Sequence, residues 1–383
     1  MKNKLFFAAG AALLLAATVL VSCCSGVNES QKTLTVDIDY LLSNEKVSIY
    51  DMFSKVELIA LDSTCPISNS VHTGESYLTY DGENFYVLDE RTYKVNVYKD
   101  NGDILCHADK VGRGPSEYAM GYQIEYNPSA DKIEILNPMG KILQYETGSF
   151  EYVSELNFMG KPLSTHNFCV SGKDYILYSS REEDKLYVLC GDDSEVMSFG
   201  YTPPEYLRKY ISPQSPFFYM NDAPCIFRPY DGLIYTLDVS DHTMNVILGW
   251  NFGKYQCRFQ DIPYDKSVME YREFILDYSQ NHIASFFNIK SVDDRIFASV
   301  IFKGNTHTVY YDLRNDQTFF FRDTIEEMLF LPELFHGNVM YKFVDCKNLP
   351  DFVNRSILDV QSQQAYDKVV EEEGAAIIKY TLK

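Results

Sequence analysis

Short stretches in which apolar and polar residues alternate recur along the chain, separated by turn residues, and one unit shows the pattern clearly. Alternation at a period of two indicates half-buried β-strands, and Asp-Gly and Asn-Gly pairs favour tight hairpin turns. The turns of this unit lie at Asp81-Gly82 and Asp100-Asn101-Gly102. The strands between them are predicted at residues 76–80, 84–88, 94–98 and 104–108. Four strands joined by short turns make one meander of the size of a propeller blade.

The same unit recurs about six times along the chain. Its first turn can be followed at Asp81-Gly82, Ala130-Asp131, Gly172-Lys173, Asn221-Asp222, Asp293-Asp294 and Gly337-Asn338. The steps between these turns are 49, 42, 49, 72 and 44 residues, and the long step contains a helical insertion. Repeats of this length, each with four short strands, are typical of propellers. The sequence therefore predicts an all-β fold, a six-bladed β-propeller.

The two ends of the β region are predicted to close the ring. Residues 56–61 form a strand with no blade of its own, whereas the last unit has only three strands, at 334–335, 339–344 and 377–382. An incomplete blade would expose unpaired strand edges. The N-terminal strand is therefore expected to join the last blade as its fourth, outer strand.

Two stretches break the β pattern. Residues 267–279 and 351–373 place apolar side chains near helical spacing. The first stretch would link blades four and five, and the second would join two middle strands of blade six. Both connections fall on the same face of a propeller, so both helical insertions are expected there, at one mouth of the central channel.

The first residues have the parts of a secretory signal in the required order. Lys2 and Lys4 precede an apolar run from Leu5 to Leu20, and small residues precede Cys23. The tetrapeptide Leu-Val-Ser-Cys at 20–23 resembles the lipobox of bacterial lipoproteins, in which cleavage precedes the cysteine and the cysteine is acylated. The alternative is an uncleaved membrane helix, for which an apolar run of roughly 16 residues is short.

Cys24 fits the lipobox less well, because it would put Cys23 where the motif has Gly, Ala or Ser. The chain is therefore divided into a signal peptide (1–22), a lipidated Cys23 with a linker (23–45) and the propeller (46–383). The expected membrane contact is through the lipid on Cys23.

Charge and composition narrow the classes of function. The chain carries 34 basic and 54 acidic residues, so its formal charge is −20, or −22 once the two lysines of the signal are removed. Nucleic acid is not an expected partner, because no basic stripe is present to displace counterions from phosphates. The 30 Tyr and 25 Phe favour pleated, half-buried surfaces. Of the nine cysteines, four in apolar runs are expected to be small buried hydrophobes, with disulfides as the alternative: Cys106, Cys169, Cys190 and Cys225.

Several segments together resemble a known family. They are the lipobox, the early strand at 56–61, the segment Val-Asn-Val-Tyr-Lys-Asp-Asn-Gly-Asp at 95–103, and above all Gly-Arg-Gly-Pro-Ser-Glu-Tyr at 112–118. They are similar to those of the six-bladed β-propeller lipoproteins of Bacteroides and related gut bacteria, which resemble NHL-repeat propellers. The resemblance covers nearly all of the mature chain. It implies the fold and the anchor but no reaction, because most members have none assigned.

The residues after Cys23 bear on location. In these bacteria, lipoproteins sent to the cell surface often carry an acidic cluster directly after the lipidated cysteine. Here residues 24–28 are neutral and the first acidic residue is Glu29. The resemblance therefore implies an anchor in the outer membrane that faces the periplasm, with the cell surface as the alternative.

Candidate ligand-binding residues lie in loops that are expected on one face. In the loop 112–118, the Arg113 guanidinium could bind a carboxylate or a sugar hydroxyl. Alternatively, Arg113 pairs with Glu117 while the glycines and the proline set the turn. Polar and aromatic residues that converge on one mouth suit a ligand with several hydroxyls, although any solvated loop also contains them. The candidates are Arg91, Tyr93, Arg113, Glu117, Tyr118, Arg181 and Tyr230.

No catalytic motif is recognisable in the sequence. There is no G-x-S-x-G elbow, HExxH pair, phosphate loop or dinucleotide fingerprint, so no catalytic residue, cofactor or metal site is predicted. Glu371 to Glu373 are interpreted as a solvated helix end rather than a calcium site. The leading hypothesis is a monomeric binding or scaffold lipoprotein for a glycan, a peptide or an envelope protein. The alternative is a lyase or hydrolase that gathers some of the seven histidines and arginines around the channel, with or without a metal.

Overall fold

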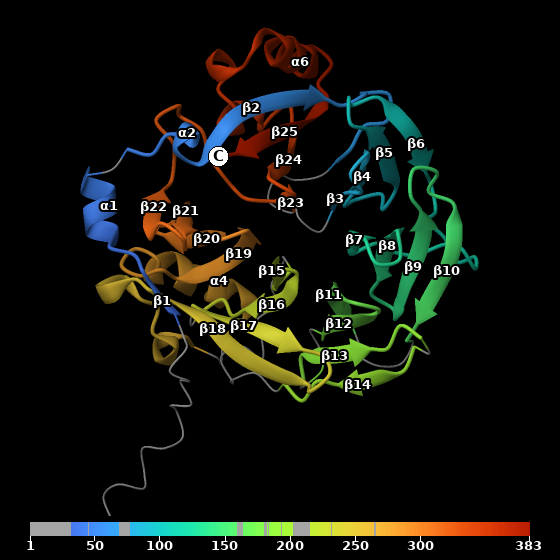
Figure 1. Ribbon diagram of the computed structural model, residues 1–383, viewed down its shortest axis with the longest axis horizontal. Coiled ribbons are helices and arrows are strands. Elements are labelled where there is room, and N and C mark those ends of the chain that lie inside the picture. Colours follow the sequence, from blue (N-terminus) through green and yellow to red (C-terminus); the bar gives the residue numbers. More distant parts are fainter. Residues whose placement is uncertain are drawn as a thin grey trace, which may run out of the picture.

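Six β-sheets are arranged radially around a central axis (Figure 1). The computed structural model describes residues 32–44, 46–68, 77–158, 164–179, 182, 184–192, 194–201, 215–230, 232–263 and 266–383. The predicted all-β, six-bladed propeller is confirmed.

Each of the first five blades is an antiparallel meander that runs outward from the channel in chain order. Blades one and two comprise β3 (Leu78–Tyr80), β4 (Asn84–Leu88), β5 (Val95–Lys99), β6 (Ile104–Ala108), β7 (Gln123–Asn127), β8 (Lys132–Asn137), β9 (Lys141–Glu146) and β10 (Tyr152–Asn157). Blades three and four comprise β11 (Thr165–Ser171), β12 (Asp174–Ser179), β13 (Leu186–Leu189), β14 (Val196–Ser198), β15 (Phe217–Met220), β16 (Ala223–Phe227), β17 (Leu233–Asp238) and β18 (Thr243–Asn251). Blade five comprises β19 (Ser285–Val292), β20 (Arg295–Phe302), β21 (Asn305–Asp312) and β22 (Gln317–Phe321).

The apolar core is divided among the gaps between neighbouring blades. A separate cluster of buried side chains fills each gap, from the one between blades one and two to the one between blades six and one. Because each blade packs on both faces, its middle strands are buried on both faces and read as nearly continuous apolar runs. In β20, for example, Ile296 to Val300 are all completely buried.

The N-terminal strand closes the ring. Blade six comprises β23 (Leu334–His336), β24 (Val339–Asp345), β25 (Ala375–Leu382) and, outermost, β2 (Phe53–Ala60). β2 is antiparallel to β25, with Glu57 opposite Lys379 and Leu58 opposite Ile378. The predicted closure is therefore confirmed, and the edge of β25 is covered.

The helical insertion of blade six lies at the rim of the ring. It consists of α5 (Leu349–Phe352), the 3-10 turn η4 (Arg355–Ile357) and α6 (Val360–Glu371), whose first turn is capped by Asp359. The Leu58 N–H donates to the Ser362 Oγ over 3.2 Å, so α6 covers the outer edge of β2 (Figure 1). The expectation that this helix crowds the channel mouth is wrong, because its apolar face packs on the last strand outward.

The other insertion, between β18 and β19, comprises η2 (Gly253–Tyr255), η3 (Phe259–Asp261) and α4 (Val268–Tyr278). Ser267 and Glu270 form a capping box at the start of α4. At its end, the Ser279 Oγ accepts from the Gly304 N–H over 3.0 Å. This contact places the end of α4 beside the β20–β21 loop. That loop joins the second and third strands of its blade, so the end of α4 lies on the face of the ring where such loops emerge. Both insertions thus leave the ring on one face, as predicted.

The chain before β2 is more ordered than the sequence indicated. β1 (Lys32–Thr35) adds to β18 as a parallel fifth strand, α1 (Ile38–Asn44) packs beside β22, and α2 (Ile49–Met52) leads into β2. Leu34 and Ile38 are buried in the cluster between blades four and five. The linker assigned to 23–45 therefore does not hold for residues 32–44, which belong to the folded domain.

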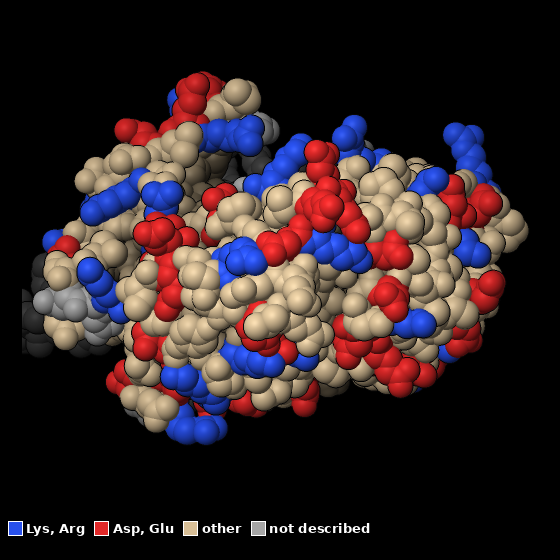
Figure 2. All heavy atoms as spheres, turned by 90° about the horizontal axis from the view of Figure 1, so that it is seen from above, with Lys and Arg blue, Asp and Glu red and all other residues tan. Residues whose placement is uncertain are grey.

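Charged side chains of both signs are interspersed on the side of the ring that carries α6. Figure 2 shows this side without a continuous basic stripe. Its surface is consistent with the excess of acidic over basic residues in the sequence.

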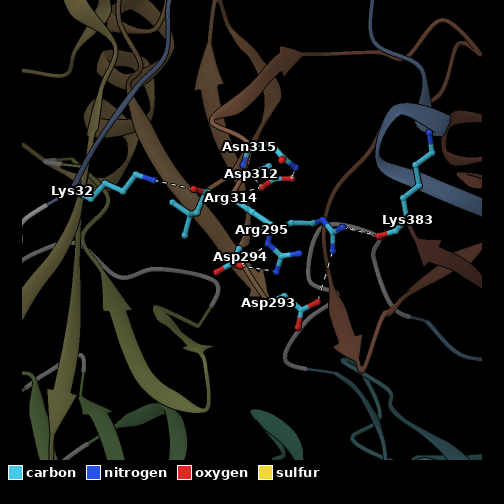
Figure 3. Close-up of polar contacts among 9 residues, drawn as sticks. Lys32, Asp293, Asp294, Arg295, Asp312, Arg314, Asn315 and Lys383 are labelled. Carbon is cyan, nitrogen blue, oxygen red and sulfur yellow. Dashed lines mark hydrogen bonds and ion pairs between the residues drawn. The ribbon is translucent and has the colours of Figure 1, made fainter.

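A polar cluster on blade five ties both ends of the described chain to the ring (Figure 3). The Arg295 guanidinium donates to the Lys383 main-chain oxygen over 2.6 Å. Lys32 Nζ donates to the Leu313 carbonyl over 3.1 Å, and Arg314 forms an ion pair with Asp294 at 2.8 Å. These contacts add to the strand pairings that hold β1 and β25.

Side chains also join the blades across their gaps. The Gln123 amide both accepts from the Phe168 N–H and donates to the Phe168 carbonyl, each over 2.9 Å, which joins blades two and three. The Tyr219 hydroxyl bonds to the Val170 N–H and carbonyl in the same manner, which joins blades three and four. These bonds satisfy main-chain groups that the radial sheets leave without a strand partner.

A buried carboxylate adds a further link between blades two and three. The Glu134 Oε1 accepts from the Tyr175 hydroxyl at 2.6 Å, the Gln144 amide at 2.8 Å and the Asn127 amide at 3.1 Å. Burial raises the pKa of Glu134, and these three hydrogen bonds partly offset that effect.

Candidate functional site

The central channel is narrow and is lined by the inner strands of all six blades. Its cavity measures about 170 Å³, and its charged lining residues are Glu125, Lys290 and Glu333. Glu333 is also paired with Lys342 at 3.2 Å, and both side chains are almost completely buried. Several lining groups, among them Gln123 and Tyr219, already hold blades together. The channel therefore serves mainly as part of the core.

No histidine lines the channel in the part of the chain that the structure describes. His107 bonds to Asn96, His282 stacks on Tyr278, and His307 stacks on Phe320. Within the same residues, no group of three or more His, Cys, Asp or Glu side chains is suited to hold a metal. The enzyme alternative, which needs histidines gathered on the axis, draws no support from these positions.

A larger cleft of about 420 Å³ lies between blades six and one, on the face that carries the helical insertions. One wall comes from blade six and the other from blade one, and residues 61–68, which follow β2, run along the cleft. The lining residues are Leu61, Asp62, Ser63, Cys65, Pro66, Ile67, Ser68, Arg91, Tyr98, Asp345, Cys346, Lys347, Glu372, Glu373, Gly374 and Ala375.

Asp89 fixes the geometry of the blade-one wall. Its side chain is 5% exposed and accepts from the main-chain N–H groups of Ser68 at 2.6 Å, Arg91 at 2.9 Å and Thr92 at 2.7 Å. These bonds fasten Ser68, in the segment after β2, to the β4–β5 turn. Asp89 thereby places the Arg91 side chain at the cleft.

Most carboxylates of the cleft already accept hydrogen bonds from nearby residues. The Thr64 hydroxyl and amide lower the pKa of Asp62. The Asn348 amides donate to Asp345, and the Ser63 hydroxyl donates to Glu372 over 2.8 Å. Across the described chain, by contrast, no side-chain hydrogen bond or ion pair engages Arg91, Lys347 or Glu373. The groups available to a ligand therefore carry both signs of charge.

A family described as six-bladed β-propeller, DUF5128, has a sequence model that matches residues 27–332. The chain belongs to this family. The match covers most of the chain, including β2, and the structure completes the ring with β23, β24 and β25, which follow the matched residues. The resemblance stated from the sequence is thus confirmed for the family and the fold.

Solved propellers share this fold at low identity. A Bacteroides fragilis protein described as exported is 14% identical, with a TM-score of 0.72 over 92% of this chain and 99% of its own. A DUF4221 member from Bacteroides vulgatus is 10% identical, with a TM-score of 0.53 over 88% of this chain and 98% of its own. No curated protein matches the chain. At these identities the likeness concerns the fold alone.

Of the residues predicted to bind a ligand, Arg91 lies in the cleft of this propeller. Tyr93 follows in the same turn in a left-handed conformation, with φ at 58°, and packs against the core between blades one and two. Tyr118 is completely buried, and its hydroxyl donates to the Tyr93 carbonyl over 2.7 Å. The two tyrosines therefore hold the β4–β5 turn in place.

The loop 112–118 lies outside the cleft lining. Glu117 accepts from the Gly114 N–H over 2.8 Å, and no ion pair joins it to the exposed Arg113 in the described chain. A Cβ atom at Gly112 would lie 1.9 Å from the Glu117 Oε2, so this glycine permits the close approach of the carboxylate. The expected pairing of Arg113 with Glu117 is wrong, because the carboxylate closes its own turn.

Tyr230 is 1% exposed and packs with Cys257 and Ile262 beneath α4, so it does not face a ligand. Arg181 and Cys23 lie outside the described residues. Of the four cysteines expected to be buried, Cys169 and Cys225 are buried and Cys106 and Cys190 are partly exposed; all four are free thiols.

No local pattern in the sequence predicts the role of Asp89 or the cleft positions of Asp62, Lys347, Glu372 and Glu373. The three consecutive glutamates at 371–373 were the available signal, but they were interpreted as a solvated helix end. The packing of blade six against blade one brings this helix end next to the blade-one loops.

Proposed function

We propose that this propeller is an exported, lipid-anchored binding protein that holds a small polar ligand in the cleft between blades six and one. The observation that carries the proposal is the cleft itself, which has a volume of about 420 Å³ and lining groups of both charges. Ligand sites are usually concave, with volumes of about 300–1,000 Å³ and a few convergent polar groups. The ligand classes are a glycan, a peptide or an exposed segment of an envelope protein.

Export and anchoring are supported by the N-terminal sequence. This segment has the parts of a lipoprotein signal: a charged start, an apolar run and the Leu-Val-Ser-Cys tetrapeptide that ends at Cys23. The similar Bacteroides fragilis propeller is described as exported. Among the described residues, no helix is long and apolar enough to cross a membrane. The lipid would lie in the outer membrane and hold the propeller on its periplasmic side. The alternative location is the cell surface.

Replacing Cys23 with alanine is expected to abolish lipidation, because the acyl chains attach to this residue. Cells that express the tagged chain would be fed an alkyne fatty acid, and label on the purified protein would be measured. The matched variant Cys24→Ala should keep the label. Label that survives in Cys23→Ala but disappears in Cys24→Ala would contradict the assignment.

The binding role is tested with the domain from residue 30 onward on glycan and peptide arrays. Binding to at least one class is expected, and Arg91→Glu should weaken it more than tenfold because the charge at the cleft is reversed. The control Arg113→Glu reverses another exposed arginine, which lies outside the cleft lining, and should leave binding unchanged. Equal losses in both variants, or no binding to any envelope glycan or peptide, would count against the proposal.

A further inference from the structure

We infer that the ligand of the cleft between blades six and one is a short peptide with a free amino group and a free carboxylate. The inference rests on the proposed function, since it names the ligand class of the same site. It depends on the separation of charge across the cleft. The Glu373 carboxylate lies on the blade-six wall and the Arg91 guanidinium lies on the blade-one wall, and neither group has a side-chain partner in the described chain.

The negative pole lies at the C-terminal end of α6. This helix ends at Glu371, and Glu372 and Glu373 follow it into the cleft lining. The carbonyl groups at a helix C-terminus carry a partial negative charge, so acidic side chains there oppose folding. The Glu372 carboxylate accepts from the Ser63 hydroxyl, whereas the Glu373 carboxylate has no hydrogen bond or ion pair within the described residues. A ligand ammonium would meet both carboxylates and the helix end.

The positive pole is Arg91, on the opposite wall. The buried Asp89 fixes its main chain, so the guanidinium extends from a held turn rather than from a free loop. A guanidinium presents paired N–H donors that match a carboxylate. Lys347, which follows β24, lies on the blade-six wall and is not part of this pole. A ligand carboxylate would therefore bind at Arg91 while the ammonium points toward α6.

The balance of charge favours such a ligand over a neutral sugar or a simple anion. Four carboxylates line the cleft against two cations, so its net formal charge is 2 − 4 = −2, and an isolated anion would be repelled. A neutral sugar would leave Arg91 and Glu373 without charged partners. Pro66, Ile67 and Tyr98 supply apolar surface for small side chains between the two poles.

The experiment is titration calorimetry on the purified full-length chain in detergent, with trialanine as the probe. Trialanine with free ends is expected to bind, and N-acetylation or C-terminal amidation should each weaken binding at least tenfold. Cellotriose serves as the neutral oligosaccharide of similar length and is expected to show no binding. Equal affinities for the free and capped peptides would overturn the inference.

Matched variants locate the two poles. Glu373→Gln should weaken binding of the free peptide but not of the N-acetylated peptide. Arg91→Ala should weaken binding of the free peptide but not of the amidated peptide. Glu371→Gln, at the same helix end but outside the cleft lining, and Arg113→Ala should change neither. If cellotriose binds and Arg91→Ala abolishes its binding, the proposed function stands and the peptide inference fails. If neither probe binds and the arrays are also blank, both fail.

Discussion

Replacing Glu57 with proline is expected to lower the free energy of unfolding by about 3 kcal/mol more than Glu57→Ala does, because it removes a main-chain donor from the ring closure. The Leu58 N–H points outward to Ser362 on α6, so the preceding N–H, that of Glu57, points inward to β25. Glu57 lies directly opposite Lys379 in that pairing. Both variants lose the exposed ion pair with Lys55, so the difference between them isolates the main-chain effect.

The measurement is urea unfolding followed by the fluorescence of Trp250, which is 4% exposed in blade four and therefore reports from a distant blade. Loss of closure leaves the edge of β25 unpaired, and exposed edges promote association. Size-exclusion chromatography should accordingly show oligomers of Glu57→Pro at concentrations where Glu57→Ala is monomeric. Equal unfolding midpoints for the two variants would contradict a closing role for β2.

Lys342→Met is expected to lower the free energy of unfolding by about 3 to 5 kcal/mol, because it takes the ammonium away from a buried carboxylate. Lys342 and Glu333 are 3% and 2% exposed and lie 3.2 Å apart. The Lys342 ammonium also lies 4.7 Å from the centre of the Phe352 ring. Both side chains are therefore largely shielded from bulk water, which would otherwise replace these contacts.

The double variant Lys342→Met, Glu333→Leu should recover at least half of the loss, since it removes both charges and retains apolar volume. Lys94→Met, which breaks the exposed pair with Asp109, is the control and should cost less than about 1 kcal/mol. Chemical denaturation at one pH gives the free energies of unfolding of the unsubstituted chain and of the three variants. A cost for Lys342→Met no larger than that for Lys94→Met would show that the buried pair does not stabilise blade six.

The sequence predicted those elements whose signals are local. In blade one, the second and fourth strands were placed exactly at 84–88 and 104–108, because alternation and tight-turn residues lie within a few positions of each other. The helix expected at 267–279 is α4, since its capping box is encoded in adjacent residues. The closing strand was also predictable, because one strand was missing at the end of the chain and one was in excess at its start.

Other features depend on partners that are distant along the chain. β1 has four residues and pairs in parallel with β18, more than 200 residues later, so no local pattern predicts it. The sequence predicted ligand contact for Tyr118 and Tyr230, because an aromatic side chain in a loop can either pack in the core or contact a ligand. The structure buries both, and burial is set by what packs above a loop.

The sequence by itself determined the number of blades and the closure of the ring, since both follow from the spacing of strands and turns. It also predicts a lipoprotein signal from short-range chemistry. Only the tertiary structure decided where a ligand could bind. The cleft is assembled from residues 61–68, Arg91, the end of β24 and the end of α6, which converge because the ring brings blades six and one together. Charge separation across that cleft is a property of packing, and no stretch of the sequence contains it.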